Sequence, residues 1–353
     1  MILKVGVTMK QLIRPKALKK GDTVATVSLS WGAAGSPEIR WKYDHGKQRM
    51  ESLLGVHVKE MPHTLAPEEY VAAHPEARAA DLMQAFSDPE VKAIICCIGG
   101  SDSVKMLPYL DFDIIRNNPK IFTGYSDSTV SNFICMKAGL SAFYGCHVLN
   151  DFAENGKMAE YSLDSIRRTL FVPEAPGEIC PADFWCAGDE RWTNPEFRDV
   201  CREYRPETHG VEVVQGVGTV RGRLIGGCMS VVEALKDTIL FPDADEFEDT
   251  ILFFEVVSWA PECVAKALED YHARGMLQGV RGILFGKPYD EYKYEEYRNV
   301  LAETLQKLGY GDMPLFYNMT FGHNDPKFLI PYGALAEMDA ETGAFRILEP
   351  GVE

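Results

Sequence analysis

The sequence lacks the features that mark membrane proteins and nucleic-acid-binding proteins. No run approaches the roughly 18 apolar residues that a membrane-spanning helix requires. Basic residues are in the minority, since 36 Lys and Arg stand against 52 Asp and Glu and give a formal charge of −16. A surface this acidic repels nucleic-acid phosphates and anionic membranes, so neither is expected as a partner. The opening Met1–Lys10 is too short and too often interrupted by lysine for a signal peptide, which favours a cytoplasmic protein.

Patterns that bind metals, nucleotide phosphates or disulfide partners are also missing. His-x-x-x-His, His-Glu-x-x-His, Cys-x-x-Cys and G-x-x-x-x-G-K-[ST] do not occur. The nine cysteines are odd in number, and several lie in apolar runs, as Cys96, Cys97 and Cys135 do. We therefore expect reduced, mostly buried thiols, and neither a metal ion nor an organic cofactor.

What the sequence does contain is a globular chain long enough for about two domains. Its 353 residues are 46% apolar and 25% charged, a balance that excludes intrinsic disorder, collagen and coiled coil. In residues 23–145, short apolar runs alternate with helical patterns, as when 91–98 (VKAIICCI) is followed by 103–110. Such alternation indicates an α/β fold with a mostly parallel sheet.

The composition changes after this region and suggests where domains end. Prolines and tryptophans interrupt 150–205, which is typical of a linker or a long surface loop. Glycines at 216, 218, 222, 226 and 227 indicate closely turning β-structure, and 334–339 with 344–348 predict a closing hairpin. We expect an N-terminal α/β domain in 1–165, a linker and substrate loop in 166–210, and a C-terminal domain in 211–353.

A serine between a predicted strand and a predicted helix is the first candidate for chemistry. Ser126 lies in Gly124-Tyr125-Ser126-Asp127-Ser128, where a sharp turn would lift its hydroxyl above the carboxyl edge of a parallel sheet. The backbone N–H groups that follow would point at a ligand there. The alternative is that Ser126 or Asp127 only caps the helix.

The loop Gly99-Gly100-Ser101 ends the preceding predicted strand. Neighbouring strand ends in a parallel sheet would place it beside Ser126, where its N–H groups could complete an oxyanion hole. A plain turn between strand and helix is the alternative for this loop.

A serine nucleophile also needs a base and an acid that orients the base. His323 lies in a loop after a predicted strand, in Phe321-Gly322-His323-Asn324-Asp325, whereas the other histidines except His147 lie in polar stretches. Glu255 ends the apolar run 251–254, where a carboxylate is costly unless it is paired. A charged histidine would be its natural partner, although His323 could be structural and Glu255 could reach water.

Two other readings of the residues stay open. Cys146-His147 suggests a cysteine hydrolase, but neighbours on a strand point to opposite faces and do not readily form a nucleophile–base pair. A non-catalytic ligand-binding module would use Ser126 only as a helix cap.

These residues resemble the LD-carboxypeptidase family of serine peptidases. The resemblance implies a triad of Ser126 as nucleophile, Glu255 as acid and His323 as base, with the backbone N–H groups of Gly100 and Asp127 as the oxyanion hole. It also implies a flavodoxin-like N-terminal sheet with helices on both faces, a β-rich swivelling α/β C-terminal domain, no cofactor, and a homodimer. The matching blocks follow the family's order along the chain: 77–103, 120–129, 218–228, 250–262, 282–289 and 316–339.

Finer features are similar to the microcin C immunity peptidase branch of that family. Murein-recycling members resemble the pattern I-G-G-N, whereas this chain has Cys228 at the last position of that pattern. The insert at 180–205 is also long. That branch stacks a loop tryptophan on the nucleobase of its aminoacyl-nucleotide substrate. Trp192 matches this residue best and Trp185 second.

The resemblance therefore implies a serine peptidase or amidase that cleaves an amide next to a small C-terminal amino acid or in an aminoacyl-nucleotide. Gly99 and Ser101 are expected to contact that substrate, and the 180–205 loop is expected to act as a lid. A murein tetrapeptide LD-carboxypeptidase is the alternative.

Overall fold

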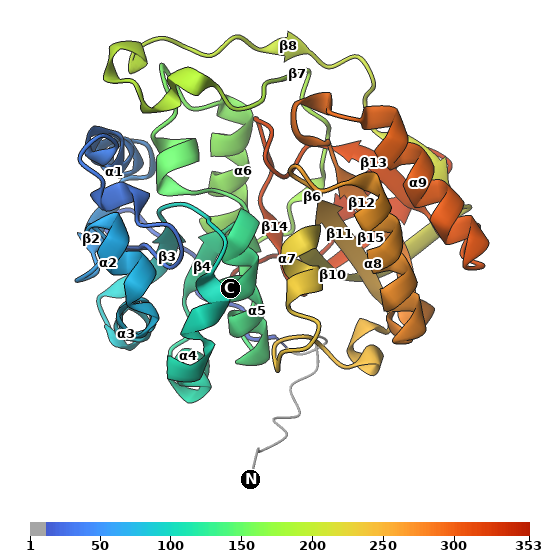
Figure 1. The fold of residues 1–353 in the computed structure, drawn as a ribbon, viewed down its shortest axis with the longest axis horizontal. Coiled ribbons are helices and arrows are strands. Elements are labelled where there is room, and N and C mark those ends of the chain that lie inside the picture. The colour runs from blue at the N-terminus through green and yellow to red at the C-terminus, as the bar shows by residue number, and fades with distance from the viewer. Residues whose placement is uncertain (1–11) are drawn as a thin grey trace.

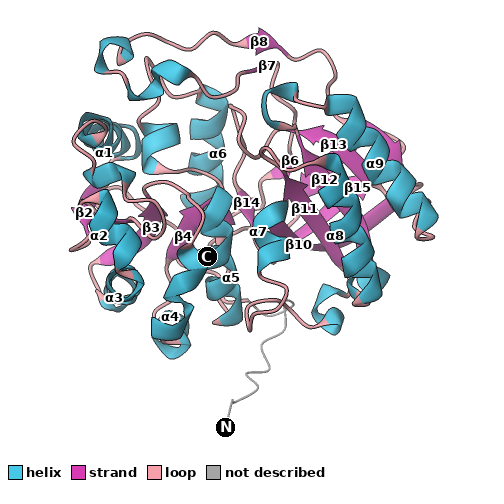
Figure 2. Ribbon diagram, in the orientation of Figure 1, coloured by secondary structure: helices cyan, strands magenta, loops and turns pink. Residues whose placement is uncertain are grey.

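The computed structural model describes residues 12–353 and shows two α/β units lying side by side (Figure 1). Helices flank the strands of the N-terminal unit, and in the C-terminal unit the helices lie in front of the sheet in the view of Figure 2. Within the described residues, no helix is long and apolar enough to cross a membrane. The absence of a signal peptide was expected from Met1–Lys10, which lies outside the described residues.

The N-terminal unit is built on a largely parallel sheet. Among residues 12–353, its strand order is β14-β5-β4-β3-β1-β2, and only β14 runs antiparallel to its neighbour. The strands are β1 (Thr23–Val27), β2 (His57–Glu60), β3 (Val91–Cys96), β4 (Ile121–Gly124), β5 (Phe143–Tyr144) and β14 (Ile330–Pro331), and the helices are α1 (Arg40–Leu54), α2 (Glu68–Ala73), α3 (Pro75–Ser87), α4 (Phe112–Asn117), α5 (Thr129–Lys137) and α6 (Glu160–Leu170).

Helices cover both faces of this sheet because its central strands are apolar on both sides. In β3, Ala93 and Ile95 pack into one hydrophobic cluster with α1 and α6, whereas Ile94 packs into another with α3 and α5. A strand buried on both faces reads as a continuous apolar run. The α/β class expected from the sequence is thus confirmed.

The C-terminal unit is a mixed sheet. In the described part of the chain its order is β6-β16-β15-β10-β11-β12-β13-β9, with β10 to β13 parallel to one another and the outer strands antiparallel. The strands are β6 (Gly177–Glu178), β9 (Glu212–Gln215), β10 (Thr219–Cys228), β11 (Thr250–Glu255), β12 (Val280–Gly286), β13 (Leu315–Met319), β15 (Leu335–Asp339) and β16 (Ala344–Ile347), and the helices are α7 (Met229–Ala234), α8 (Pro261–Ala273) and α9 (Tyr294–Lys307). The predicted closing hairpin is confirmed by β15 and β16.

The composition suggested that the glycine-rich stretch turns closely, which is correct only for Gly216 and Gly218, between β9 and β10, where φ is 103° and 68°. Residues 219–228 form the single strand β10, which runs between β11 and β15. A Cβ at Gly226 would lie 1.7 Å from the carbonyl oxygen of Phe253. Here glycine permits two backbones to approach closely, a role that the sequence pattern does not distinguish from turning.

The expected linker contains more regular structure than its composition suggested. Helix α6 runs through residue 165, where we expected the first domain to end, and buries Leu163, Ile166 and Leu170. Residues 180–205, which we name the cavity segment, hold β7 (Phe184–Trp185) and the start of β8 (Arg205–Pro206). The chain crosses from one unit to the other near β7 and β8, at the top of Figure 1.

Candidate active site

Ser126 occupies a strained turn at the carboxyl end of β4. Its φ is 58°, a value that non-glycine residues rarely adopt, and it begins a short 3₁₀ turn that continues into α5. A Cβ at Gly99 would lie 3.0 Å from the Ser126 hydroxyl, so the loop after β3 passes very close to it. Strained backbone of this kind is concentrated at functional sites.

The carboxylate of Asp127 ties this turn to its neighbours. It accepts hydrogen bonds from Ser30 Oγ at 2.6 Å, from the backbone N–H of Ser103 at 2.9 Å and from Ser103 Oγ at 2.7 Å. A Cβ at Gly99 would lie 3.3 Å from the Asp127 nitrogen. The loops that carry Gly100 and Asp127, the two expected oxyanion donors, therefore lie in contact.

Glu255 and His323 meet, as the sequence suggested. Glu255 ends β11 and is fully buried, and its Oε2 lies 2.8 Å from Nδ1 of His323. Burial alone raises the pKa of Glu255, but the charge and hydrogen bond of His323 and the hydroxyl of Tyr144 outweigh burial and hold it below its usual value. An ionised carboxylate at Nδ1 favours the tautomer in which Nδ1 carries the proton and Nε2 can accept one.

Tyr144 joins the acid to the serine turn, and sequence reasoning missed it. Its hydroxyl donates to Oε1 of Glu255 at 2.6 Å and accepts the backbone N–H of Ser126 at 3.3 Å. The signal that could have found it is its place in β5, where it pairs with Gly124 at the end of β4. Residues paired across neighbouring strand ends share one edge of a sheet.

A cavity of about 600 Å³ reaches this group at His323, whereas Ser126 and Glu255 are not among its lining residues. Tyr125 and His323 line it, and their ring centroids lie 5.2 Å apart. Trp192 lines the same cavity from the cavity segment, whereas Trp185, Gly99 and Ser101 are not among the lining residues. Of the four expected substrate-contacting residues, only Trp192 therefore reaches this space.

Trp192 is held in place from the N-terminal unit. Lys42 Nζ lies 5.2 Å from its ring centroid, and the ring of Trp31 meets it edge-on at 6.5 Å. Next to it, Trp41 Nε1 donates to the carbonyl of Thr193 at 3.1 Å. Trp185 is buried elsewhere, with Lys287 Nζ 4.4 Å from its ring centroid.

The cysteine-hydrolase alternative does not fit the structure. Cys146 is 2% exposed, and burial raises the pKa of its thiol far above the usual value, so the thiolate that would attack is absent. His147 is also buried, and its Nε2 accepts the backbone N–H of Tyr125 at 3.1 Å. Burial and the nearby Lys327 lower the pKa of His147 well below its usual value, so it supports the serine turn as a neutral ring.

All nine cysteines lie in the described part of the chain and are free thiols, six of them buried, as expected. Among residues 12–353, no group of three or more His, Cys, Asp or Glu side chains is placed to hold a metal ion.

Two family models match the chain. Residues 24–145 match the LD-carboxypeptidase N-terminal domain, and residues 221–338 match the LD-carboxypeptidase C-terminal domain. The chain belongs to the LD-carboxypeptidase family. It is therefore a hydrolase with a serine peptidase function, and the non-catalytic alternative falls away.

Two relatives come from Bacillus subtilis. YocD, which is named as a carboxypeptidase, is 30% identical over 342 residues, covering 94% of this chain and 97% of the relative. A second, named as a murein peptide carboxypeptidase, is 29% identical over 346 residues, covering 96% and 95%.

Solved structures place the chain near the microcin immunity branch. An MccF-like protein from Streptococcus pneumoniae, solved with AMP, superposes with a TM-score of 0.84 at 30% identity and covers 93% of this chain and 98% of its own. The microcin C7 self-immunity protein MccF of Escherichia coli, solved with aspartyl sulfamoyl adenosine, gives a TM-score of 0.85 at 23% identity and covers 97% and 100%. The latter likeness concerns the fold.

Proposed function

We propose that Ser126, His323 and Glu255 form the catalytic triad of this peptidase. The observation that carries the proposal is the 2.8 Å contact between His323 and the buried Glu255, beside a serine held at a φ of 58°. Glu255 fixes the orientation of the imidazole, and His323 Nε2 takes the proton of the Ser126 hydroxyl.

The hydroxyl oxygen of Ser126 then attacks the carbonyl carbon of the scissile amide. The backbone N–H groups of Gly100 and Asp127 bind the oxyanion, an interaction worth about 3–4 kcal/mol for each donor. His323 gives its proton to the leaving amine, the C–N bond of the tetrahedral intermediate breaks, and an acyl-enzyme remains on Ser126. A water that His323 deprotonates releases the acid and restores the serine.

The substrate that we favour is an aminoacyl-nucleotide in which Trp192 stacks on the base. This is supported by the position of Trp192 in the cavity wall and by the AMP bound to the MccF-like relative. The relative named as a murein peptide carboxypeptidase supports a second candidate, a murein tetrapeptide that loses its C-terminal amino acid.

The test offers both substrates to the full-length chain in parallel and identifies the products by mass spectrometry. An aspartyl-nucleotide amide and a murein tetrapeptide are used, with the Ser126→Ala variant as the control. We expect the nucleotide amide to be cleaved faster, and no product from the variant. Faster cleavage of the tetrapeptide would replace the first substrate by the second and leave the triad in place.

A C-terminal domain that begins at residue 211, a cytoplasmic location and a homodimer complete the proposal. The free thiols are consistent with a reducing compartment. Sedimentation analysis tests the dimer, because a single species with the mass of one chain would exclude it.

A further inference from the structure

The cavity segment is joined to the loop that carries the proposed base. We name residues 321–327 the base loop. Cys186 and Asp325 exchange backbone hydrogen bonds, with N···O distances of 2.7 Å and 2.8 Å, and so form an antiparallel bridge between the two. This bridge lies two residues from His323 in the sequence.

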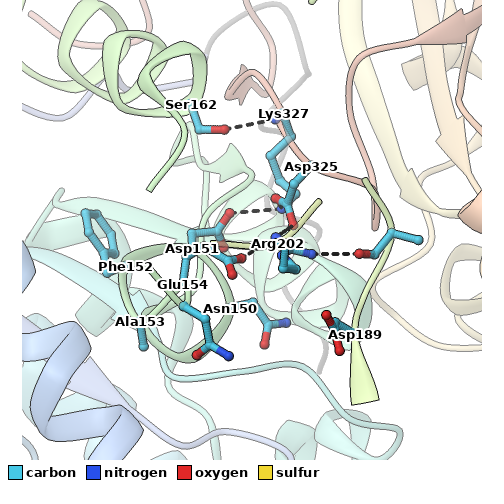
Figure 3. Close-up of polar contacts among 12 residues, drawn as sticks. Asn150, Asp151, Phe152, Ala153, Glu154, Ser162, Asp189, Arg202, Asp325 and Lys327 are labelled. Atoms are coloured by element: carbon cyan, nitrogen blue, oxygen red, sulfur yellow. Dashed lines mark hydrogen bonds and ion pairs between the residues drawn. The ribbon is translucent and has the colours of Figure 1, made fainter. Parts of the chain in front are cut away.

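Arg202 strengthens this junction with its side chain, which is 8% exposed. Its Nη2 lies 2.6 Å from Oδ2 of Asp325 and also donates to Oε2 of Glu154, while Nη1 donates to the carbonyl of Ala187 at 2.8 Å. Figure 3 shows Arg202 with Glu154 and Asp325. One guanidinium therefore joins the N-terminal unit, the cavity segment and the base loop.

The base loop is held from its other side as well. Lys327 Nζ bonds Oδ1 of Asp325 and lies 3.0 Å from Oδ1 of Asp151, and the Lys327 and Asp151 side chains are 4% and 1% exposed (Figure 3). Burial raises the pKa of Asp325, but the attraction of Lys327 and Arg202 outweighs it and lowers that pKa to about 2. Asp325 is thus charged between two cations, and removing either leaves a buried charge poorly compensated.

This junction connects substrate contact with the chemistry. Gly188 and Trp192 of the cavity segment line the same cavity as His323. A substrate that binds in this cavity contacts the cavity segment, and Arg202 ties that segment to the base loop. A displacement of about 1 Å at a reacting group can cost about 100-fold in rate.

We propose that Arg202 is a positioning residue that holds the cavity segment and the base loop as one unit, so that the segment that receives the substrate also sets the place of His323. The proposal rests on the proposed function of Ser126 and His323. It assigns to the cavity segment a role in the chemical step in addition to the lid role expected from the sequence.

The experiment compares full-length Arg202→Met, Arg202→Lys and wild type. Arg274→Met is the matched control, because Arg274 forms an exposed ion pair with Asp237 far from the cavity. Two quantities are measured across neutral pH. The first is the rate constant for labelling of Ser126 by a fluorophosphonate, and the second is kcat and KM on an aspartyl-nucleotide amide.

We expect Arg202→Met to lower the labelling rate constant and kcat by about 100-fold and to move the pH midpoint of labelling. Arg202→Lys should recover part of the loss, because lysine restores the charge but cannot replace the two guanidinium nitrogens that donate to different partners. Arg274→Met should match wild type.

A wild-type labelling rate and midpoint in Arg202→Met, with only KM raised, would overturn the proposal and leave Arg202 as an anchor of the lid. Should Arg202→Met fail to fold, a wild-type rate and midpoint in Arg202→Lys would overturn it equally. A wild type that takes no label contradicts the triad itself, which is a separate result.

Discussion

The hydroxyl of Tyr144 donates a 2.6 Å hydrogen bond to the carboxylate of Glu255, whose other oxygen faces His323 at 2.8 Å. Both oxygens of this fully buried carboxylate are therefore engaged. Because the same hydroxyl accepts the N–H of Ser126, one side chain of the N-terminal sheet reaches the acid of the C-terminal sheet and the turn of the nucleophile.

Replacing Tyr144 by Phe should raise the pKa of Glu255, because a hydrogen bond to its charged form is lost. The acid limb of the kcat/KM profile should move to higher pH, and stability should fall by about 1–3 kcal/mol. Kinetics over a pH series and denaturant unfolding measure the two effects.

Tyr317→Phe is the matched control, since Tyr317 is equally buried and its hydroxyl bonds the carbonyl of Tyr294 at 2.7 Å. It should lose stability and keep the wild-type pH profile. The same profile in Tyr144→Phe and wild type would exclude a role for Tyr144 in holding Glu255.

The charged cluster around Asp325 predicts a pH dependence of stability. Burial raises the pKa of Asp325, but Lys327 and Arg202 lower it from 3.8 to about 2. Since the folded-state pKa lies below the unfolded one, the stabilisation is complete above the unfolded value and is lost as the pH falls from 3.8 towards 2. The free energy of unfolding of wild type minus that of Asp325→Asn should shrink over this range in denaturant titrations. A difference that stays constant with pH would contradict the ionised state of Asp325.

Trp192→Ala should weaken the binding of substrates that carry a nucleobase much more than the binding of peptide substrates. Loss of base stacking costs about 1–3 kcal/mol, which corresponds to a rise in KM of about 5-fold to 150-fold. Trp185→Phe should leave KM unchanged, because Trp185 does not line the cavity. Equal losses on nucleotide and peptide substrates in Trp192→Ala would reject stacking.

Cys146→Ala should retain the activity of wild type, and iodoacetamide should not inactivate the native protein through this residue. The thiol is 2% exposed and, because burial raises its pKa, it stays protonated. Peptide mapping after alkylation measures its reactivity. Activity lost in this variant while its melting temperature is kept would reopen the cysteine mechanism.

The sequence predicted those features that depend on residues close together in the chain. Residues 93–97 alternate between two buried clusters, so both faces of the strand are apolar and the sequence there is a continuous apolar run. Glu255 was found because a carboxylate at the end of an apolar strand needs a partner. Long-range relations left no such local sign. Tyr144 and Arg202 act through residues 111 and 123 positions away. The place of Tyr144 in β5 indicates the sheet edge at which it lies but not its contact with Glu255, and the residues next to Arg202 in the sequence indicate none of its contacts.

Two local patterns were also misleading. Helix α6 was missed because the surrounding prolines and tryptophans dominated the composition, although Leu163, Ile166 and Leu170 follow helical spacing. The glycines of β10 indicated a turn, whereas the missing side chain of Gly226 allows the backbone of Phe253 to lie close to it.

Fluorophosphonate labelling followed by peptide mass spectrometry tests the central assignment most directly. Wild type should carry one phosphonyl group on the peptide that contains Ser126. Ser126→Ala should carry none there and should lose turnover by about 10⁶-fold, as expected for loss of a triad serine, with its melting temperature nearly unchanged. A label on any other residue, or equal turnover in the variant, would contradict Ser126 as the nucleophile.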